Sequence, residues 1–127
     1  MIYIYNTKLE DHTDNPNNYP IYRSTILGNP FTHDGKKSSL ARFSFRTRDE
    51  AVDAYRPYFK GMYKNDAQFK ALVDEIYEKY KEGEDIYLQC FCAPLRCHGE
   101  IIRDELQKRL IKEKMAEVRQ KSASIKA

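Results

Sequence analysis

All three cysteines of the chain lie close to a histidine, within the nine consecutive residues from Cys90 to His98. Thiolates and imidazoles act as nucleophiles, metal ligands and redox groups, so this segment is where chemistry is expected first. No apolar run approaches the roughly 20 residues of a membrane span, and Met1–Tyr5 lacks the pattern of a signal peptide. We therefore expect a cytoplasmic protein, in which clustered cysteines are metal ligands or reactive groups more often than structural bridges.

Zinc is one interpretation of the cluster, because zinc binds sulfur and nitrogen atoms in proteins. The four candidate ligands are Cys90, Cys92, Cys97 and His98. Their spacing differs from that of structural zinc sites, whose paired ligands are usually separated by roughly two to four residues. Adjacent residues such as Cys97 and His98 also point about 100° apart if they are helical. Zinc is therefore an alternative and not the leading interpretation.

A reactive thiol is a second interpretation, with Cys90 or Cys92 as nucleophile and His98 as acid-base partner, since histidine titrates near neutral pH. Cys90 and Arg96 also have the C-x5-R spacing of the phosphate-binding loop of cysteine phosphatases. That loop directs several backbone N–H groups at one phosphate, whereas here Pro94 removes an N–H group and no glycine lies between. Redox exchange between Cys90 and Cys92 would need a strained short loop. Whether the protein is an enzyme stays open.

The predicted elements place the cluster at the carboxyl end of a strand. Residues 85–91 alternate in a way that is typical of a strand. A long amphipathic helix follows, with Pro94 suited to its first turn and Cys97 and His98 within or just before that turn. In open α/β sheets ligands collect at this edge, where the unpaired N–H groups of a helix attract anions and acidify thiols. The expected ligand is therefore an anionic, nucleotide-like small molecule.

Two further strands and a loop are predicted in the first part of the chain. Ile2–Tyr5 is β-branched and aromatic, which is typical of a strand inside a sheet. The segment Asp11–Pro20 is rich in Asp, Asn and Pro and predicts a surface loop. Residues 22–27 predict a second short strand, and Gly28 and Asn29 then turn the chain.

Two helices are predicted between these strands and the cluster. Thr47 is a capping residue and Glu50 stands three positions later, so a helix should begin here. Pro57 should kink or split this helix. Asp66 begins a second helix with apolar residues at helical spacing, and Gly83 ends it.

The order of elements predicts one α/β domain over residues 1–121, a small sandwich of two or three layers. Its sheet is expected to be short, mostly parallel and Rossmann-like, with a long C-terminal helix. Residues 32–46 are ambiguous between a strand and an irregular segment, and residues 122–127 predict a flexible basic tail. Residues 108–127 contain seven Lys and Arg against two Glu. Such a basic helix attracts nucleic acid, although a solvated helix end has the same composition.

Three segments together resemble a family of small phage and bacterial proteins known as a domain of unknown function. They are Ile26–Phe31, Thr47–Ala51 and Cys90–Glu100. The family's marks are a G-N-P-F turn and a C-x-C-x-P-x-x-C-H-G-[DE] element, and the resemblance covers residues 22–106. It implies one compact α/β domain in which the region of Asn29 and Arg48 meets the cysteine element. A phage-encoded member would be located in the host-cell cytoplasm.

We therefore expect a pocket between the G-N-P-F turn and the cysteine element. The predicted ligand-binding residues are Gly28, Asn29, Arg48, Arg96, Cys97, Gly99 and Glu100, and the candidate catalytic residues are Cys90, Cys92 and His98. In a purely structural alternative, the two strand-end cysteines pack beneath the helix, and His98 and Glu100 cap its first turn. Asn29 before a proline is also a common turn residue. In a different functional class, the protein is a zinc-stabilised module without catalysis, whose basic C-terminal helix contacts nucleic acid or a host protein.

Overall fold

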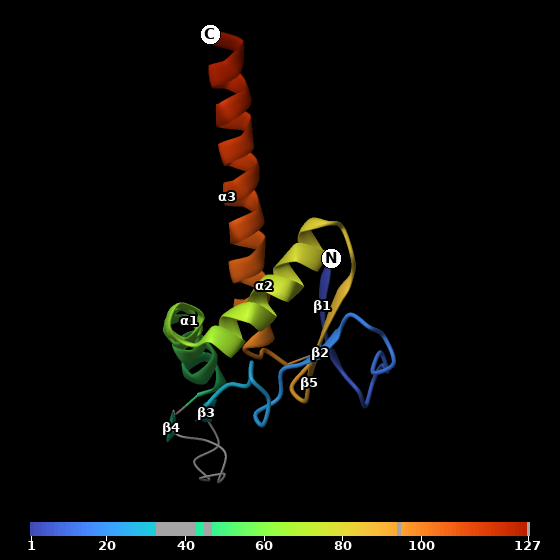
Figure 1. Ribbon diagram of the computed structural model, residues 1–127. Helices are drawn as coiled ribbons and strands as arrows, with labels where there is room; N and C mark the ends of the chain where they lie inside the picture. The colour runs from blue at the N-terminus through green and yellow to red at the C-terminus, as the bar shows by residue number, and fades with distance from the viewer. Residues whose placement is uncertain (33–42, 45–46, 94, 127) are drawn as a thin grey trace.

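The computed structural model describes the chain at residues 1–32, 43–44, 47–93 and 95–126. The strands are β1 (Ile2–Asn6), β2 (Asn18–Pro20), β3 (Phe31–Thr32), β4 (Phe43–Ser44) and β5 (Ile86–Cys90). The helices are α1 (Arg48–Asn65), α2 (Ala67–Lys81) and α3 (Gly99–Lys126). The mixed α/β class, the parallel sheet and the long C-terminal helix are confirmed (Figure 1).

The main sheet is parallel and has the order β1-β5-β2, so β5 is the central strand. Ile86, Leu88 and Cys90 of β5 are all buried, as their alternation predicts. The predicted position of β1 inside the sheet is wrong, because β1 is an edge strand in which Tyr3 keeps 38% of its surface exposed. The strand that ends at the cysteine cluster is therefore the one with a partner on both sides.

β2 lies in the segment predicted to be a loop, and the strand predicted over residues 22–27 is wrong. Three residues are enough to bring Tyr19 into the core. Pro20 is tolerated because β2 is an edge strand, where a residue without an N–H group leaves no partner unpaired. The chain then forms two successive turns, closed by backbone hydrogen bonds to the carbonyl oxygens of Tyr22 and Thr25 (both 2.9 Å).

The helices α2 and α3 pack on one face of the sheet, and α1 packs against both, which gives two layers (Figure 1). The core between the layers includes fully buried Tyr55, Phe69 and Tyr77 from the helices. The opposite face of the sheet carries Tyr87. The ring of His12, in the loop between β1 and β2, stacks on Tyr87 with ring centroids 4.1 Å apart. Among the described residues, a loop and not a helix therefore covers that face.

Both α1 and α2 begin where their capping residues predict. Thr47 Oγ1 accepts a hydrogen bond from the N–H of Glu50 (3.1 Å), and Asp66 makes the corresponding bond at the start of α2. Gly83 follows the end of α2 with a φ of 92°. Pro57 does not split α1, which runs on as one helix. Its ring is exposed to solvent, while the buried residues on the other side of the helix keep both halves against the core.

The helix α3 begins at Gly99, so Cys97 and His98 lie just before its first turn, which is one of the two positions predicted for them. Pro94, expected in that turn, lies outside the described residues. The backbone of α3 is helical through Lys126, and the flexibility predicted for residues 122–127 stays a prediction. The segment 32–46, predicted to be either a strand or irregular, contains β4 and the last residue of β3, and these two strands form a short parallel ladder. No helix in the described part of the chain has the length and hydropathy needed to cross a membrane.

Candidate functional site

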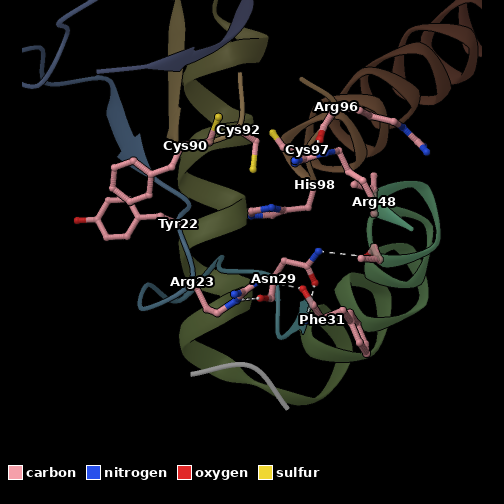
Figure 2. A pocket seen from close by; sticks show the side chains of 13 residues that line it. Tyr22, Arg23, Asn29, Phe31, Arg48, Cys90, Cys92, Arg96, Cys97 and His98 are labelled. Carbon is pink, nitrogen blue, oxygen red and sulfur yellow. Dashed lines mark hydrogen bonds between the residues drawn. The ribbon is translucent and has the colours of Figure 1, made fainter. Parts of the chain in front are cut away.

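A cavity of about 250 Å³ opens at the carboxyl end of β5, the edge at which the sequence predicts a ligand. Three parts of the chain line it (Figure 2): the segment from Tyr22 to Phe31, the first turn of α1, and the loop from Cys90 to His98. Turns and a loop form much of its wall, while the sheet and helices fix where these segments meet. The G-N-P-F turn and the cysteine element therefore face one space although some 60 residues separate them.

Cys90 and Cys97 form a buried pair of thiols in the wall of the cavity. Cys97 donates a hydrogen bond to the Cys90 sulfur, and this bond lowers the pKa of Cys90 although burial opposes it. The N–H of Ala93 also donates to Cys90 Sγ (3.3 Å). The same thiol-thiol bond, together with burial, raises the pKa of Cys97. Cys90 is therefore the more acidic thiol of the pair.

Cys92 is half-buried, and its sulfur points into the cavity (Figure 2). Cys90, Cys92 and Cys97 are free thiols. The described residues contain no group of three or more His, Cys, Asp or Glu side chains placed to hold a metal ion. The geometry therefore gives no support to the four zinc ligands proposed from the sequence.

His98 is buried, and its ring is bound to the backbone of the turn that follows β2. Its Nε2 lies 2.7 Å from the carbonyl oxygen of Ile21, and its ring packs against Tyr55 with centroids 4.8 Å apart. Burial lowers the pKa of His98 to about 4, although contacts with the Ile21 and Leu27 backbone oppose this. Because a carbonyl oxygen only accepts, Nε2 of the neutral ring carries the proton. The ring therefore links the start of α3 to the backbone that follows β2. The function of His98 as an acid-base partner stays a prediction.

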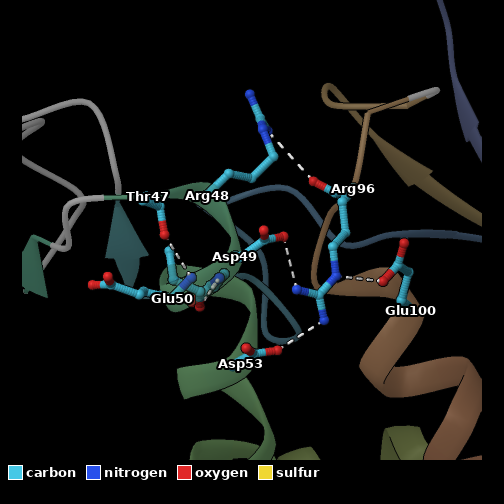
Figure 3. Close-up of polar contacts among 9 residues, drawn as sticks. Thr47, Arg48, Asp49, Glu50, Asp53, Arg96 and Glu100 are labelled. Atoms are coloured by element: carbon cyan, nitrogen blue, oxygen red, sulfur yellow. Dashed lines mark hydrogen bonds and ion pairs between the residues drawn. The ribbon is translucent and has the colours of Figure 1, made fainter.

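Arg96, which was expected to bind an anion, already has its charge matched by carboxylates of the protein (Figure 3). Its guanidinium donates to Glu100 Oε2 (2.8 Å), and to Asp49 Oδ1 (2.9 Å) and Asp53 Oδ1 (2.8 Å) on α1. These three carboxylates raise the pKa of Arg96 above its ordinary value. Glu100 lies in the first turn of α3, so Arg96 ties the starts of α1 and α3 together. Little of its charge is left for a ligand.

Arg23 and Arg48 line the same cavity, and no described carboxylate pairs with either of them. Arg23 donates through Nε to Asn29 O (3.2 Å) and through Nη2 to Phe31 O (3.0 Å), which holds it against the turn. Arg48 donates through Nη1 to the backbone oxygen of Arg96 at 3.5 Å. Within the described part of the chain, neither guanidinium has a carboxylate partner, and both could donate to an anion. The sequence reasoning found Arg48 but missed Arg23, whose one signal is its place next to the turn.

This cavity lies within a segment that matches a known family. Residues 5–108 match the model of a domain of unknown function, DUF4326. The chain therefore belongs to the DUF4326 family. This match confirms the prediction that the chain belongs to a family described as a domain of unknown function. A comparison with curated proteins and one with solved structures each find no match.

Gly28, Asn29 and Gly99, which were predicted to bind the ligand, shape the DUF4326 fold around the cavity. A Cβ on Gly28 would lie 2.6 Å from two backbone oxygens of the preceding turn, which leaves no room for a side chain. Asn29 donates through Nδ2 to Ala51 O on α1 (3.1 Å) and accepts the N–H of Phe31 (3.0 Å). A Cβ on Gly99 would lie 3.0 Å from a side chain at the sheet. These residues therefore hold the walls of the cavity together.

Proposed function

We propose that this DUF4326 domain binds a small anionic molecule in the cavity at the carboxyl end of β5. The observation that carries the proposal is a contrast among three arginines that line one space. Arg96 is matched by three carboxylates, whereas Arg23 and Arg48 have none among the described residues. A phosphate or carboxylate between these two guanidiniums would match their charge through bidentate hydrogen bonds.

The position of Arg48 adds a second argument. Arg48 is the first residue of α1, where the partial positive charge of the helix makes a cation unfavourable by roughly 0.3–1 kcal/mol. An anion in the cavity would remove this cost and would also interact with the N-terminal end of α3, which begins beside the same space. The arrangement is therefore better suited to a bound anion than to an empty cavity.

The rim of the cavity supports a ligand that carries a flat ring. The rings of Tyr22 and Phe91 lie with centroids 4.9 Å apart, and Phe91 keeps 60% of its surface exposed. An exposed aromatic face stacks on nucleobases with little preference among them. The cavity volume of about 250 Å³ lies just below the roughly 300–1,000 Å³ of pockets for drug-sized ligands. A nucleotide-like molecule would place its anionic group inside and its base on the rim.

The proposal does not require catalysis. If the ligand is an electrophile, Cys90 is the better nucleophile because its pKa is lowered, whereas Cys92 is the more accessible of the two. The alternative of a zinc-stabilised module has no support from the described geometry. Metal analysis of the purified protein separates the two functions, because stoichiometric zinc that is lost in Cys97→Ser would favour that alternative.

Isothermal titration with inorganic phosphate, adenosine, AMP, CMP, GMP and UMP tests the proposal directly. We expect at least one nucleoside monophosphate to bind more tightly than phosphate and than adenosine, because it uses both the arginines and the rim. Arg48→Gln should weaken this binding by about tenfold or more, since a hydrogen bond to a charged group contributes roughly 1.5–3 kcal/mol. Lys64→Gln, the same charge change in the last turn of α1, should leave it unaltered. Binding that Arg48→Gln does not weaken, or no binding of any probe, would refute the proposal.

A further inference from the structure

The second half of α3 lies outside both the cavity and the family match. The match ends at residue 108, whereas α3 continues to Lys126 and extends away from the rest of the molecule (Figure 1). At about 1.5 Å per residue, residues 109–126 add roughly 27 Å of helix. Every residue from 114 to 121 is exposed. An isolated helix of this length is marginal in water, so a partner that covers one of its faces would stabilise it.

One face of this projecting helix carries an apolar stripe. Ile111, Met115 and Val118 are 58%, 53% and 63% exposed, and a shallow groove runs along them. Their spacing of four and then three residues is that of the d, a and d positions of a coiled coil. Single exposed apolar residues are ordinary on protein surfaces, but an in-register series is the pattern of a helix-pairing seam.

The residues that flank the stripe are all basic. In the register set by the stripe, the e positions hold Lys112 and Arg119, and the g positions hold Lys114 and Lys121. The two glutamates of this segment fall at other positions, and Glu113 is already paired with Lys81 of α2 (3.0 Å). The e and g positions are those that set partner choice in coiled coils. The seam is therefore apolar in its centre and positively charged along both edges.

This charge pattern selects one kind of partner. A second copy of the chain would place cations opposite cations in either helix orientation, which disfavours self-pairing. The stripe is also narrow, whereas a helix that lies on a membrane buries a wider apolar face. Nucleic acid would use the cations but would leave the apolar stripe in water. A helix with apolar a and d positions and acidic e and g positions satisfies both the stripe and its edges.

We propose that the projecting half of α3 binds an acidic amphipathic helix of another protein, in a short two-stranded coiled coil. This interaction is separate from the cavity, because the ligand site lies at the start of α3 and the seam begins at Ile111, some 20 Å along the axis. The family domain would then carry the ligand site, and the additional helix would select the partner.

The full-length protein can be tested with a fluorescently labelled four-heptad peptide that has Leu at a and d and Glu at e and g. Its glutamates disfavour pairing with itself at neutral pH. We expect binding that weakens as salt is added. The triple variant Ile111→Ala, Met115→Ala, Val118→Ala should weaken binding about tenfold or more, and it preserves the helix because alanine is the best helix former. Circular dichroism of the variant checks that the helix persists.

Two charge variants distinguish pairing from general electrostatic attraction. Lys112→Glu with Arg119→Glu should weaken the peptide complex about tenfold, whereas the matched change of net charge on α1, Lys60→Glu with Lys64→Glu, should not. A version of the peptide with Lys at e and g should not bind. Equal effects of the two charge pairs would overturn the proposal. Failure of the peptide to bind would also overturn it. The proposal is likewise overturned if, instead of binding the peptide, the protein self-associates in a way that the alanine variant abolishes, or binds duplex DNA or phosphatidylcholine–phosphatidylglycerol vesicles.

Discussion

The first turn of α1 and the residues just before α3 both line the cavity, but they use their polar groups in opposite ways. Just before α3, the carbonyl oxygen of Cys97 accepts the N–H of Glu100, His98 is bound to backbone, and Arg96 is matched by three carboxylates. At the start of α1, Thr47 caps the helix, whereas the guanidinium of Arg48 has no described carboxylate partner. The polar groups at the start of α3 are therefore used within the fold, whereas the charge of Arg48 at the start of α1 is not matched by a described carboxylate.

This difference separates residues that stand out in the sequence from residues that are available for binding. The cysteine element attracts attention because it gathers reactive side chains, yet most of its polar groups bind other parts of the protein. The cations of Arg23 and Arg48 and the thiol of Cys90 all line the cavity. The following variants test whether the two helix starts differ in this way.

The largest effect is expected from the pH dependence of His98. Its pKa is lowered from 6.5 to about 4 in the folded protein, so between these values the unfolded chain binds a proton that the folded chain does not. The resulting contribution of His98 to the free energy of unfolding is complete above pH 6.5 and is lost as the pH falls toward 4. It amounts to about 3 kcal/mol in total. Urea unfolding of the wild type and His98→Gln at several pH values measures it. The difference in unfolding free energy between the two should shrink on acidification, and a constant difference would contradict the assignment.

Arg96 should contribute less than His98, because its ion pairs are partly exposed to solvent. Arg96→Met keeps the apolar stem and removes the three charge-assisted hydrogen bonds between the two helix starts. We expect the free energy of unfolding to fall by about 1–2 kcal/mol at low salt, and by less at about 1 M salt. Lys108→Met, which removes a single pair with Asp104, is the control and should lower the free energy of unfolding by about 0.3 kcal/mol. Equal losses would show that Arg96 forms no network.

Local signals predicted much of the fold. The capping residues Thr47 and Asp66 and the alternation in β5 depend on neighbouring residues alone, and each is confirmed. The short strand β2 could not be predicted in this way. Its residues read as a turn-rich loop, and they become a strand because an edge of β5 is available to them. A pairing of that kind depends on tertiary structure and leaves no periodicity in the sequence.

A cavity lies at the carboxyl end of β5, where the rule that ligands collect at the carboxyl ends of strands predicts a site. Ligand binding there stays a prediction. The sequence could not show that Arg96 meets Asp49 and Asp53, since these residues are more than 40 positions away. For the same reason Arg23 was missed, because its position in the cavity depends on how the 22–31 segment folds against α1. Residue types indicate which chemistry is available, and tertiary contacts decide which groups are already used.

A smaller effect is expected at the thiol pair. Cys97→Ala removes the hydrogen bond that lowers the pKa of Cys90, so the pH midpoint of Cys90 alkylation should rise by about one unit or more. Cys97→Ser keeps a donor at the same place and should shift the midpoint less. Both variants are made with Cys92→Ala, so that iodoacetamide labelling followed by mass spectrometry reports the buried thiols alone. Equal midpoints in the alanine and serine variants would mean that Cys97 does not stabilise the thiolate.

The smallest effect on stability is expected from Arg48, and its sign makes it informative. Arg48→Gln removes a cation from the unfavourable end of the α1 dipole, so the free energy of unfolding should stay unchanged or rise by about 0.3–0.5 kcal/mol. Lys64→Gln removes a cation from the favourable end of the same helix and should lower it by a similar amount. Urea unfolding at low salt without ligand measures both. Replacing a residue that stabilises the fold would lower the free energy of unfolding, as replacing Arg96 should. Replacing Arg48 is expected to weaken ligand binding without destabilising the fold. The two helix starts would then differ in function as they do in structure.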